Sequence, residues 1–364
     1  MAALEDVYAQ QKQSPWLDNL RRAWMLSGEL QKLIDRGVRG LTSNPSIFAA
    51  AMMTTNDYDA ELEELVKAGF SVDDAYWKMA VADVNTALGL LRPVFDSSGG
   101  EDGYVSIEVS PTLAHEEAAT VAAARQLDDL ISAPNLYVKV PATLEGIPAI
   151  ETLISEGRSI NVTLIFSLKR YASVMEAYIA GLENADDATL SSVSSVASFF
   201  ISRVDTEVDR RLTEIGTEEA LALKGKAAIA QAKLAYKLFG EKFSGPRWEA
   251  LAAKGARKQR PLWASTSTKD PSYSDTLYVD ELIGPDTVNT LPEKTLLAFD
   301  EHGTVARTID ANVDDAEAVV AKLSALGIDL EEVAQKLEAA GVASFATAFE
   351  DVLEVLGKRA AEFS

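Results

Sequence analysis

The chain has 364 residues, of which 47% are hydrophobic and 25% are charged, an ordinary composition for a globular protein with a large core. It contains no cysteine, which excludes disulfides, zinc–thiolate sites, iron–sulfur clusters and thiol catalysis. The net charge of −22 argues against binding to nucleic acid or anionic membranes, and a phosphorylated ligand would need a local group of cations or N–H donors.

The sequence has no targeting or membrane signal. Its first residues, MAALEDVYAQQKQSP, lack the basic start and apolar stretch of a secretion signal. No apolar run approaches the ~20 residues that span a bilayer. We therefore expect a soluble cytoplasmic protein without a membrane partner; the sequence carries no signal for its oligomeric state.

Strand-like and helix-like segments alternate along the chain. The predicted strands are a short extended piece at 14–19 and the segments 37–44, 104–111, 136–142, 159–166, 195–204, 260–266 and 286–292. Such alternation indicates parallel strands joined by right-handed crossovers. A closed barrel and an open doubly wound sheet both fit this spacing.

The faces of the strands favour the barrel. Apolar residues occupy one face of several strands, whereas the other face carries small polar or charged residues, such as Ser106 and Glu108, Lys139, or Asn161 and Thr163. Central strands of an open sheet are covered on both sides and read as continuous apolar runs. We therefore predict a single (β/α)8 TIM-type barrel whose strand ends carry a polar site.

After about residue 310 the strand pattern stops. Residues 310–364 are helical by their apolar spacing, with Gly327 and Gly341 as expected helix breakers. We predict a barrel domain over 1–309 and a C-terminal helical extension over 310–364 that packs on it.

Lys139 is the first candidate for chemistry, because lysine is depleted in strands and this one lies between Val138 and Val140. A lysine on an inner strand face can attack a carbonyl and form a Schiff base, and burial favours the uncharged amine that this requires. The alternative is a lysine that snorkels to the strand end and pairs with a carboxylate. The stretch NLYVKVPAT alone favours that alternative.

Glu108 and Asp18 are candidates for the proton transfers of an imine mechanism. Glu108 lies on the strand before the lysine, and Asp18 in WLDNL can hold or deprotonate a substrate hydroxyl. The alternatives are a salt bridge of Glu108 to Lys139 without chemistry, and an N-cap role of Asp18 for the helix that follows.

Small polar residues on the same strand faces suit a ligand with many hydroxyl groups, each of which needs a partner. They are Thr42, Asn44, Asn161, Thr163 and Ser198. The alternative is a buried polar network that satisfies itself and only fixes the fold.

Arg203, Ser265 and Lys269 are candidates for phosphate binding. The segment WASTSTK ends a predicted strand with hydroxyl groups and a cation, and phosphate sites are common at late strand ends of barrels. The alternative is ordinary surface charge.

Other motifs are weak. His115 lacks the second histidine of a zinc-protease helix, and His302 lies in a turn-like stretch, so we expect both at the surface. The segment from Asp310 fails as a calcium loop, because Asp315 replaces the required glycine. No glycine-rich nucleotide loop occurs.

Four segments together resemble the transaldolase family: GVRGLTSNPSIF, VSIEVSP, YVKVPAT followed by INVTLIFS, and LWASTSTK. The resemblance is to the long bacterial form, which is also found fused to a glucose-6-phosphate isomerase half that is missing here. It covers nearly the whole chain, including the C-terminal tail, and implies a barrel of the class I aldolase kind.

The resemblance also implies roles. Lys139 would form the Schiff base, Glu108 would act as acid and base through a water, and Asp18 would act on the donor hydroxyl during carbon–carbon cleavage. The dihydroxyacetone part would be bound by Thr42, Asn44, Asn161 and Thr163, with Ser198 and Phe200 lining the site and Arg203 holding phosphate. Many relatives have an arginine shortly after the AS of the seventh strand; here Ser265 and Lys269 stand in this region, and we assign phosphate to Lys269.

The implied reaction transfers a dihydroxyacetone unit from sedoheptulose 7-phosphate or fructose 6-phosphate to glyceraldehyde 3-phosphate or erythrose 4-phosphate, in the non-oxidative pentose phosphate pathway. It requires no metal or organic cofactor. The alternatives are an aldolase-like enzyme that releases dihydroxyacetone, a silent barrel that acts as a binding protein, and a metal-dependent sugar-phosphate enzyme.

Overall fold

Eight parallel strands form a closed barrel in the structure, a computed structural model that describes residues 3–363. The strands are β1 (Gln13–Asp18), β2 (Leu41–Thr42), β3 (Val105–Glu108), β4 (Leu136–Pro141), β5 (Ile160–Ile165), β6 (Ser195–Phe200), β7 (Arg260–Ala264) and β8 (Thr287–Leu291). Each strand pairs with the next, and β1 pairs with β8 to close the ring. The predicted TIM-type barrel and its eight strands are confirmed, although β2 and β3 are shorter than the sequence suggested.

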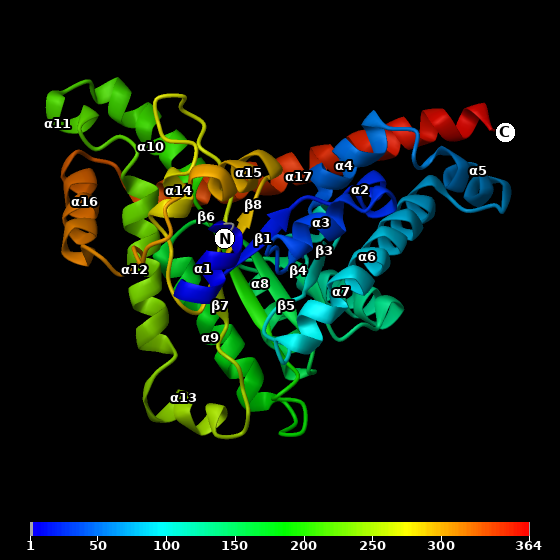
Figure 1. Cartoon of the computed structure of the whole chain (residues 1–364), viewed down its shortest axis with the longest axis horizontal. Helices are drawn as coiled ribbons and strands as arrows, with labels where there is room; N and C mark the ends of the chain where they lie inside the picture. Colours follow the sequence, from blue (N-terminus) through cyan, green and yellow to red (C-terminus); the bar gives the residue numbers. More distant parts are fainter. Residues whose placement is uncertain (1–2, 364) are drawn as a thin grey trace.

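Helices surround the barrel (Figure 1). The first half of the chain contributes α1 (Ala3–Gln11), α2 (Arg22–Ser27), α3 (Glu29–Asp35), α4 (Pro45–Thr54), α5 (Asp59–Lys67), α6 (Val72–Ser97), the 3-10 turn η1 (Pro111–Leu113), α7 (Glu117–Ile131), α8 (Gly146–Ser155) and α9 (Leu168–Asn184). The second half contributes α10 (Ser202–Ile215), α11 (Glu218–Leu221), α12 (Ala227–Lys242), α13 (Gly245–Ala252), α14 (Leu277–Asp280), α15 (Glu293–His302), α16 (Val313–Ala325) and α17 (Leu330–Glu362).

The strand register brings polar residues of neighbouring strands together. Glu108 pairs with Lys139, and Lys139 pairs with Asn161. Asp18 pairs with Thr42 at the ends of β1 and β2. Because all strands are parallel, these side chains gather at one end of the barrel, the end formed by the carboxyl ends of the strands.

Strand β5 departs from simple alternation near its end. The register against β6 shifts between Val162 and Ile165, and Leu164 has a left-handed backbone with φ of 61°. Such a conformation costs of order 1–3 kcal/mol for a residue other than glycine, and such irregularities occur next to functional sites. The regular alternation expected for the strands therefore does not hold beyond Thr163, where the Leu164 side chain lies beside Gly341 of α17.

The opposite end of the barrel is held by a buried ion cluster around Asp102. Its carboxylate accepts hydrogen bonds from Arg39 Nε at 2.7 Å, Arg260 Nη2 at 3.1 Å, Ser14 Oγ at 2.8 Å and Trp16 Nε1 at 3.2 Å. Burial alone would raise the pKa of Asp102, but the two guanidinium groups outweigh it and hold this pKa below its usual value.

Two helices follow residue 310, as predicted. Helix α16 packs against α12, and α17 packs against α4, α6 and α10 and reaches β5. Gly327 lies between them, with φ of 81°, but Gly341 is not a helix breaker: it lies inside the continuous 33-residue helix α17. The division into domains at 309 and 310 stays a prediction.

Helix α17, red in Figure 1, is fastened at its C-terminal end to α4. The Arg359 guanidinium donates to the carbonyls of Met52, Met53 and Thr55, all between 2.9 and 3.0 Å, and to Asp59. A cation on the last carbonyls of a helix satisfies their hydrogen bonds and complements the helix dipole.

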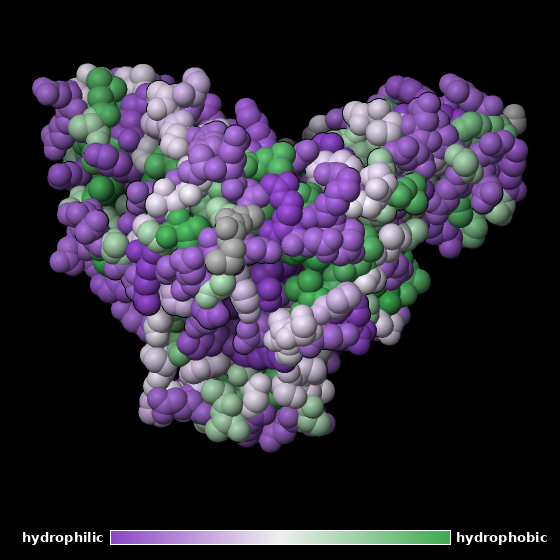
Figure 2. Space-filling model, viewed as in Figure 1, coloured by the Kyte–Doolittle hydropathy of each residue, from purple (hydrophilic) through white to green (hydrophobic). Residues whose placement is uncertain are grey.

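Polar side chains cover most of the face shown in Figure 2, with apolar groups in separate patches. Within residues 3–363, no helix is long and apolar enough to cross a bilayer.

Candidate active site

The predicted site residues surround one pocket of ≈ 170 Å³ at the carboxyl ends of the strands. Its lining includes ten of the predicted residues, namely Asp18, Thr42, Asn44, Lys139, Thr163, Ser198, Phe200, Arg203, Ser265 and Lys269. Glu108 and Asn161 lie just behind this lining. The polar faces of the strands thus place carboxylates, hydroxyls and cations around one space. We call this space the site pocket.

Lys139 and Glu108 form a buried pair at the bottom of the site pocket. Both residues are 5% exposed, and Lys139 Nζ lies 3.3 Å from Glu108 Oε2. The ammonium also donates to the Ser43 carbonyl at 3.0 Å. Within the described part of the chain, no group donates a directed hydrogen bond to Glu108 Oε2. Besides its ion pair with Lys139, this oxygen can therefore accept a hydrogen bond from a water or from a substrate hydroxyl.

Asp18 lies across the pocket at the end of a chain of hydroxyl groups. Thr42 Oγ1 donates to Asp18 Oδ1 at 2.7 Å, and Thr290 Oγ1 lies 2.6 Å from Thr42 Oγ1. Since an ionised carboxylate only accepts, the Thr42 proton points to Asp18 and the Thr290 proton to Thr42. The alternative of an N-cap is wrong, because α2 begins after Arg21 without a side-chain cap.

The electrostatics of the two carboxylates differ from those of free acids. Burial raises the pKa of Asp18, although Lys139, the Thr42 hydroxyl and Arg203 partly oppose the rise. Burial also raises the pKa of Glu108, opposed by Lys139 and reinforced by the charge of Asp18. Two carboxylates with raised pKa values, beside a lysine in one pocket, are suited to moving protons near neutral pH.

The polar ring is partly satisfied by itself and partly open. Asn161 Nδ2 donates to Ser106 Oγ at 3.0 Å, and Ser198 Oγ donates to Asn161 Oδ1 at 2.7 Å, so this asparagine is fixed in the barrel interior. Thr163 Oγ1, by contrast, is buried and has no hydrogen-bond partner among residues 3–363. A buried unpaired hydroxyl costs about 1–3 kcal/mol, which a bound polar ligand would relieve.

Asn44 has a structural task as well as a place in the pocket. Its side chain accepts from Ile47 N at 3.0 Å and caps α4, whose first residue is Pro45. The cap fixes the Asn44 side chain at the pocket wall and leaves its amide N–H groups to face a ligand.

Arg203 lies at the outer end of the site pocket without a counterion. In the part of the chain that the structure describes, no carboxylate or carbonyl accepts from its guanidinium, which instead lies 5.4 Å from the Phe200 ring centroid and 5.9 Å from that of Phe345. Burial lowers the pKa of Arg203, against the pull of Asp18 and Glu108.

Ser265 and Lys269 follow β7 at the rim. The Ser265 hydroxyl lies 2.9 Å from the Ser202 hydroxyl, and Lys269 Nζ donates to Ser267 Oγ at 2.7 Å. Partial burial and the neighbouring Arg203 lower the pKa of Lys269. Two cations in one pocket, of which Arg203 lowers the pKa of Lys269, suit an anion.

Sequence reasoning missed five residues of the pocket lining: Ala264, Ser267, Thr290, Pro292 and Phe345. Thr290 is the second-last residue of the weak strand pattern TVNTL, and the rule of polar strand ends applied to β8 could have found it. Phe345 comes from α17, and nothing in the local sequence indicates that this helix crosses the strand ends.

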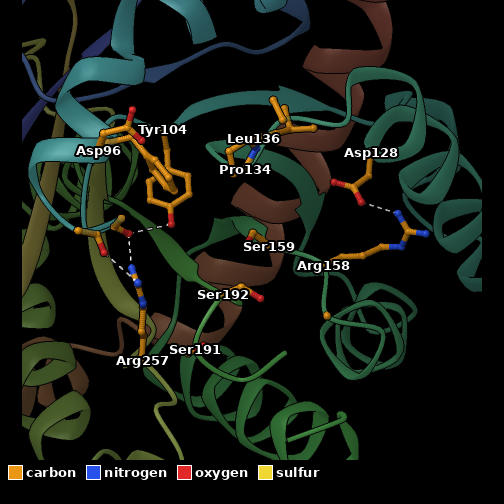
Figure 3. A pocket seen from close by; sticks show the side chains of 15 residues that line it. Asp96, Tyr104, Asp128, Pro134, Leu136, Arg158, Ser159, Ser191, Ser192 and Arg257 are labelled. Atoms are coloured by element: carbon orange, nitrogen blue, oxygen red, sulfur yellow. Dashed lines mark hydrogen bonds and ion pairs between the residues drawn. The ribbon is translucent and has the colours of Figure 1, made fainter. Parts of the chain in front are cut away.

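A larger cavity of ≈ 500 Å³ lies at the other end of the barrel, before the strands begin (Figure 3). Its charged groups are already paired: Arg158 contacts Asp128, and Arg257 donates to the carbonyls of Gly99 and Gly100. Size alone therefore does not identify the site; the unpaired groups are in the smaller pocket.

Residues 3–363 hold no group of three or more histidine, aspartate or glutamate side chains arranged for a metal ion. Both histidines are exposed, as predicted, and each contacts one carboxylate: His115 contacts Glu145 and His302 contacts Asp275.

Comparison with known proteins gives consistent matches. The family model described as Transaldolase/Fructose-6-phosphate aldolase matches residues 15–356. Transaldolase 1 of Streptomyces avermitilis is 52% identical over 347 residues, covering 94% of this chain and 92% of that protein. The transaldolase of Frankia alni is 50% identical over 348 residues, with 94% of each chain covered, and that of Thermobifida fusca is 49% identical over 350 residues, with 95% of each covered.

Proposed function

The chain belongs to the transaldolase/fructose-6-phosphate aldolase family, and from this premise we propose that it is a transaldolase that works through a Schiff base on Lys139. The donor is a ketose phosphate such as fructose 6-phosphate or sedoheptulose 7-phosphate, and the acceptor is an aldose phosphate. The observation that carries the role of Lys139 is its buried amine, 3.3 Å from Glu108 and lining a pocket that also contains Asp18. A cytoplasmic location and a place in the non-oxidative pentose phosphate pathway are part of the proposal.

The first step needs an uncharged amine and a nearby acid. Transfer of one proton from the Lys139 ammonium to Glu108 gives both, and the raised pKa of Glu108 favours this transfer. The amine then adds to the C2 carbonyl of the ketose. After the nitrogen has passed one of its protons to the former carbonyl oxygen, Glu108 gives its proton to the resulting carbinolamine hydroxyl, which leaves as water, and the iminium remains.

The second step breaks the C3–C4 bond. Asp18 takes the proton of the C4 hydroxyl, the C4 oxygen becomes the aldehyde oxygen of the leaving aldose phosphate, and the bonding electron pair moves into the iminium. The product on Lys139 is a three-carbon enamine. Addition of the enamine to the acceptor aldehyde reverses these events, and water then releases the new ketose.

The other groups of the site pocket support binding in this proposal. Thr42, Asn44, Thr163 and Ser198 suit the dihydroxyacetone hydroxyls, with Asn161 fixed behind Ser198. Phe200 lines the site, and Arg203, Ser265 and Lys269 suit the phosphate. The relatives at about half identity are named transaldolases, which favours transfer over release of dihydroxyacetone and over a silent barrel.

Trapping of the intermediate tests the proposal. The protein is incubated with fructose 6-phosphate, reduced with borohydride, and digested for mass spectrometry. We expect a stable three-carbon adduct on Lys139, lost in Lys139→Met and retained in Lys269→Met, which removes the other lysine of the pocket. An active protein whose adduct lies on another lysine, or that forms none, would refute the mechanism; product formation with and without erythrose 4-phosphate separates transfer from release.

A further inference from the structure

The C-terminal helix contributes directly to the phosphate end of the site pocket. Phe345 of α17 is 3% exposed and lines the pocket together with Arg203 and Lys269. Gly341 is buried one turn before it, so that both residues lie on the same face of α17.

Arg203 is the residue that this face contacts. Its guanidinium lies within 6 Å of the centroids of Phe345 and Phe200, the usual range for a cation–π contact. An aromatic ring contacts the flat face of a guanidinium and leaves the N–H donors at its edge free. A carboxylate partner would instead occupy those donors, and an incoming anion would have to displace it.

Gly341 lies beside the same guanidinium and packs closely on Leu164. A Cβ atom at this position would lie only 3.0 Å from Leu164 Cδ2, a tight contact, and 3.6 Å from Arg203 Nη1, an ordinary van der Waals contact. Leu164 is the residue that the β5 bulge turns toward α17. Glycine therefore allows the helix backbone to approach both side chains closely.

We propose that Phe345 and Gly341 are positioning residues that hold the Arg203 guanidinium ready for the phosphate of a sugar phosphate. The C-terminal helix thereby sets the preference for phosphorylated over unphosphorylated sugars. The inference rests on the proposed function, since it assigns Arg203 to the phosphate of the substrate.

The test compares fructose 6-phosphate with fructose as donors to one acceptor. In Phe345→Leu the ratio of kcat/KM for fructose 6-phosphate to that for fructose is expected to fall roughly 3- to 30-fold, the effect of losing a partly desolvated cation–π contact. The change should reside in KM for the phosphorylated donor. Phe349→Leu is the matched control, because Phe349 packs at 5.2 Å from the Tyr76 ring and not on Arg203, so the ratio should stay at its wild-type value.

Gly341→Val provides a second variant, since a side chain at this position would crowd Leu164 and lie in contact with Arg203; it should lower the same ratio without removing a ring. A ratio that stays constant in both variants, or that falls equally in Phe349→Leu, would overturn the inference.

Calorimetry with inorganic phosphate separates this inference from the proposed function. Weaker phosphate binding by Phe345→Leu than by wild type supports the positioning role even if no three-carbon unit is transferred. Equal binding contradicts the role even in an active transaldolase.

Discussion

Lys139 and Glu108 keep opposite charges side by side in a pocket where each is 5% exposed. Two more charges act on this pair: the carboxylate of Asp18 raises the pKa of Glu108, and the guanidinium of Arg203 lowers it. A buried pair is costly unless its remaining lone pairs and protons are satisfied. Glu108 Oε2 has Lys139 Nζ at 3.3 Å but no hydrogen bond of good geometry among residues 3–363, so it can still accept one from a substrate.

The pH dependence of activity should report Asp18. As the proposed base for the C4 hydroxyl, Asp18 must be ionised, so kcat/KM is expected to be lost as the pH falls through its pKa, which burial raises above the ~3.9 of a free aspartate. Thr42→Val removes a hydrogen bond that lowers this pKa, and the acid limb should therefore move about one to two units to higher pH.

Thr42→Ser keeps the hydroxyl and should keep the wild-type profile. The measurement is kcat/KM from pH 4 to 9 for the three proteins. An acid limb at the same pH in all of them would show that another group titrates.

Individual site residues were predictable where the alternation of side chains along a strand indicates which residues face the barrel interior. Lys139 and Glu108 stood out because charged residues interrupt β3 and β4, and parallel register explains why they meet. The Asp18–Thr42–Thr290 chain was only partly predictable, since the partner of a hydroxyl depends on the angle between strands that are remote in sequence. Phe345 was not predictable, because its place depends on the direction of a whole helix.

At the scale of elements, α17 connects the site pocket with the outer helices of the barrel, because it contributes Phe345 to the pocket and contacts α4 and α10. Its N-terminal half contacts α10 through Lys336 and Glu207 at 2.8 Å, and its C-terminal end is fixed on α4 by Arg359. Between these two attachments lie Gly341 and Phe345. The helix thus crosses the carboxyl ends of the strands and is attached to other helices on both sides of the site pocket.

Removal of the Arg359 contact should free the end of this helix. Arg359→Met keeps the aliphatic part but loses donors to three carbonyls and to Asp59, contacts with a charged group that together exceed about 2 kcal/mol. Hydrogen exchange followed by mass spectrometry should show at least tenfold faster exchange in the last turns of α17. Lys358→Met is the control, since Lys358 forms an exposed ion pair with Glu354 within the same helix. Equal exchange in wild type and Arg359→Met would contradict the role of this contact.

Element boundaries followed the sequence where local and tertiary preferences agree. Gly327 separates the two C-terminal helices, as expected for a glycine. Gly341 does not interrupt α17, because packing of this helix on the barrel outweighs the ~1 kcal/mol that glycine costs inside a helix. The β5 bulge was also invisible in INVTLIF, whose alternation is regular. Both exceptions touch the same spot, the contact of Leu164 with Gly341.

At the scale of the whole molecule, the two ends of the barrel have different tasks. The carboxyl ends of the strands hold unpaired polar groups, whereas the amino ends are closed by Asp102 with its four donors and by the stacked rings of Tyr104 and Tyr137, 4.0 Å apart. This division is typical of TIM-type barrels, in which loops at one end vary while the other end stabilises the ring.

Asp102→Asn should therefore lower stability without a direct effect on the site. The substitution leaves Arg39 and Arg260 without their buried counterion, which is expected to reduce the free energy of unfolding by about 3–5 kcal/mol. Denaturant unfolding measures the change, and kcat/KM at 25 °C should stay at the wild-type value. Glu101→Gln, one residue away and exposed, should change stability by less than ~0.5 kcal/mol. A stability loss below 1 kcal/mol in Asp102→Asn would show that the cluster is not a main support of the barrel.

The closure of the ring by β1 and β8 has a consequence for biosynthesis. A ribosome makes the chain from its N-terminus, so β1 stays an open sheet edge until residues 287–291 have emerged. Helix α17 follows later still. The wall of the site pocket that Thr290, Pro292 and Phe345 form is consequently among the last parts of the chain to be synthesised.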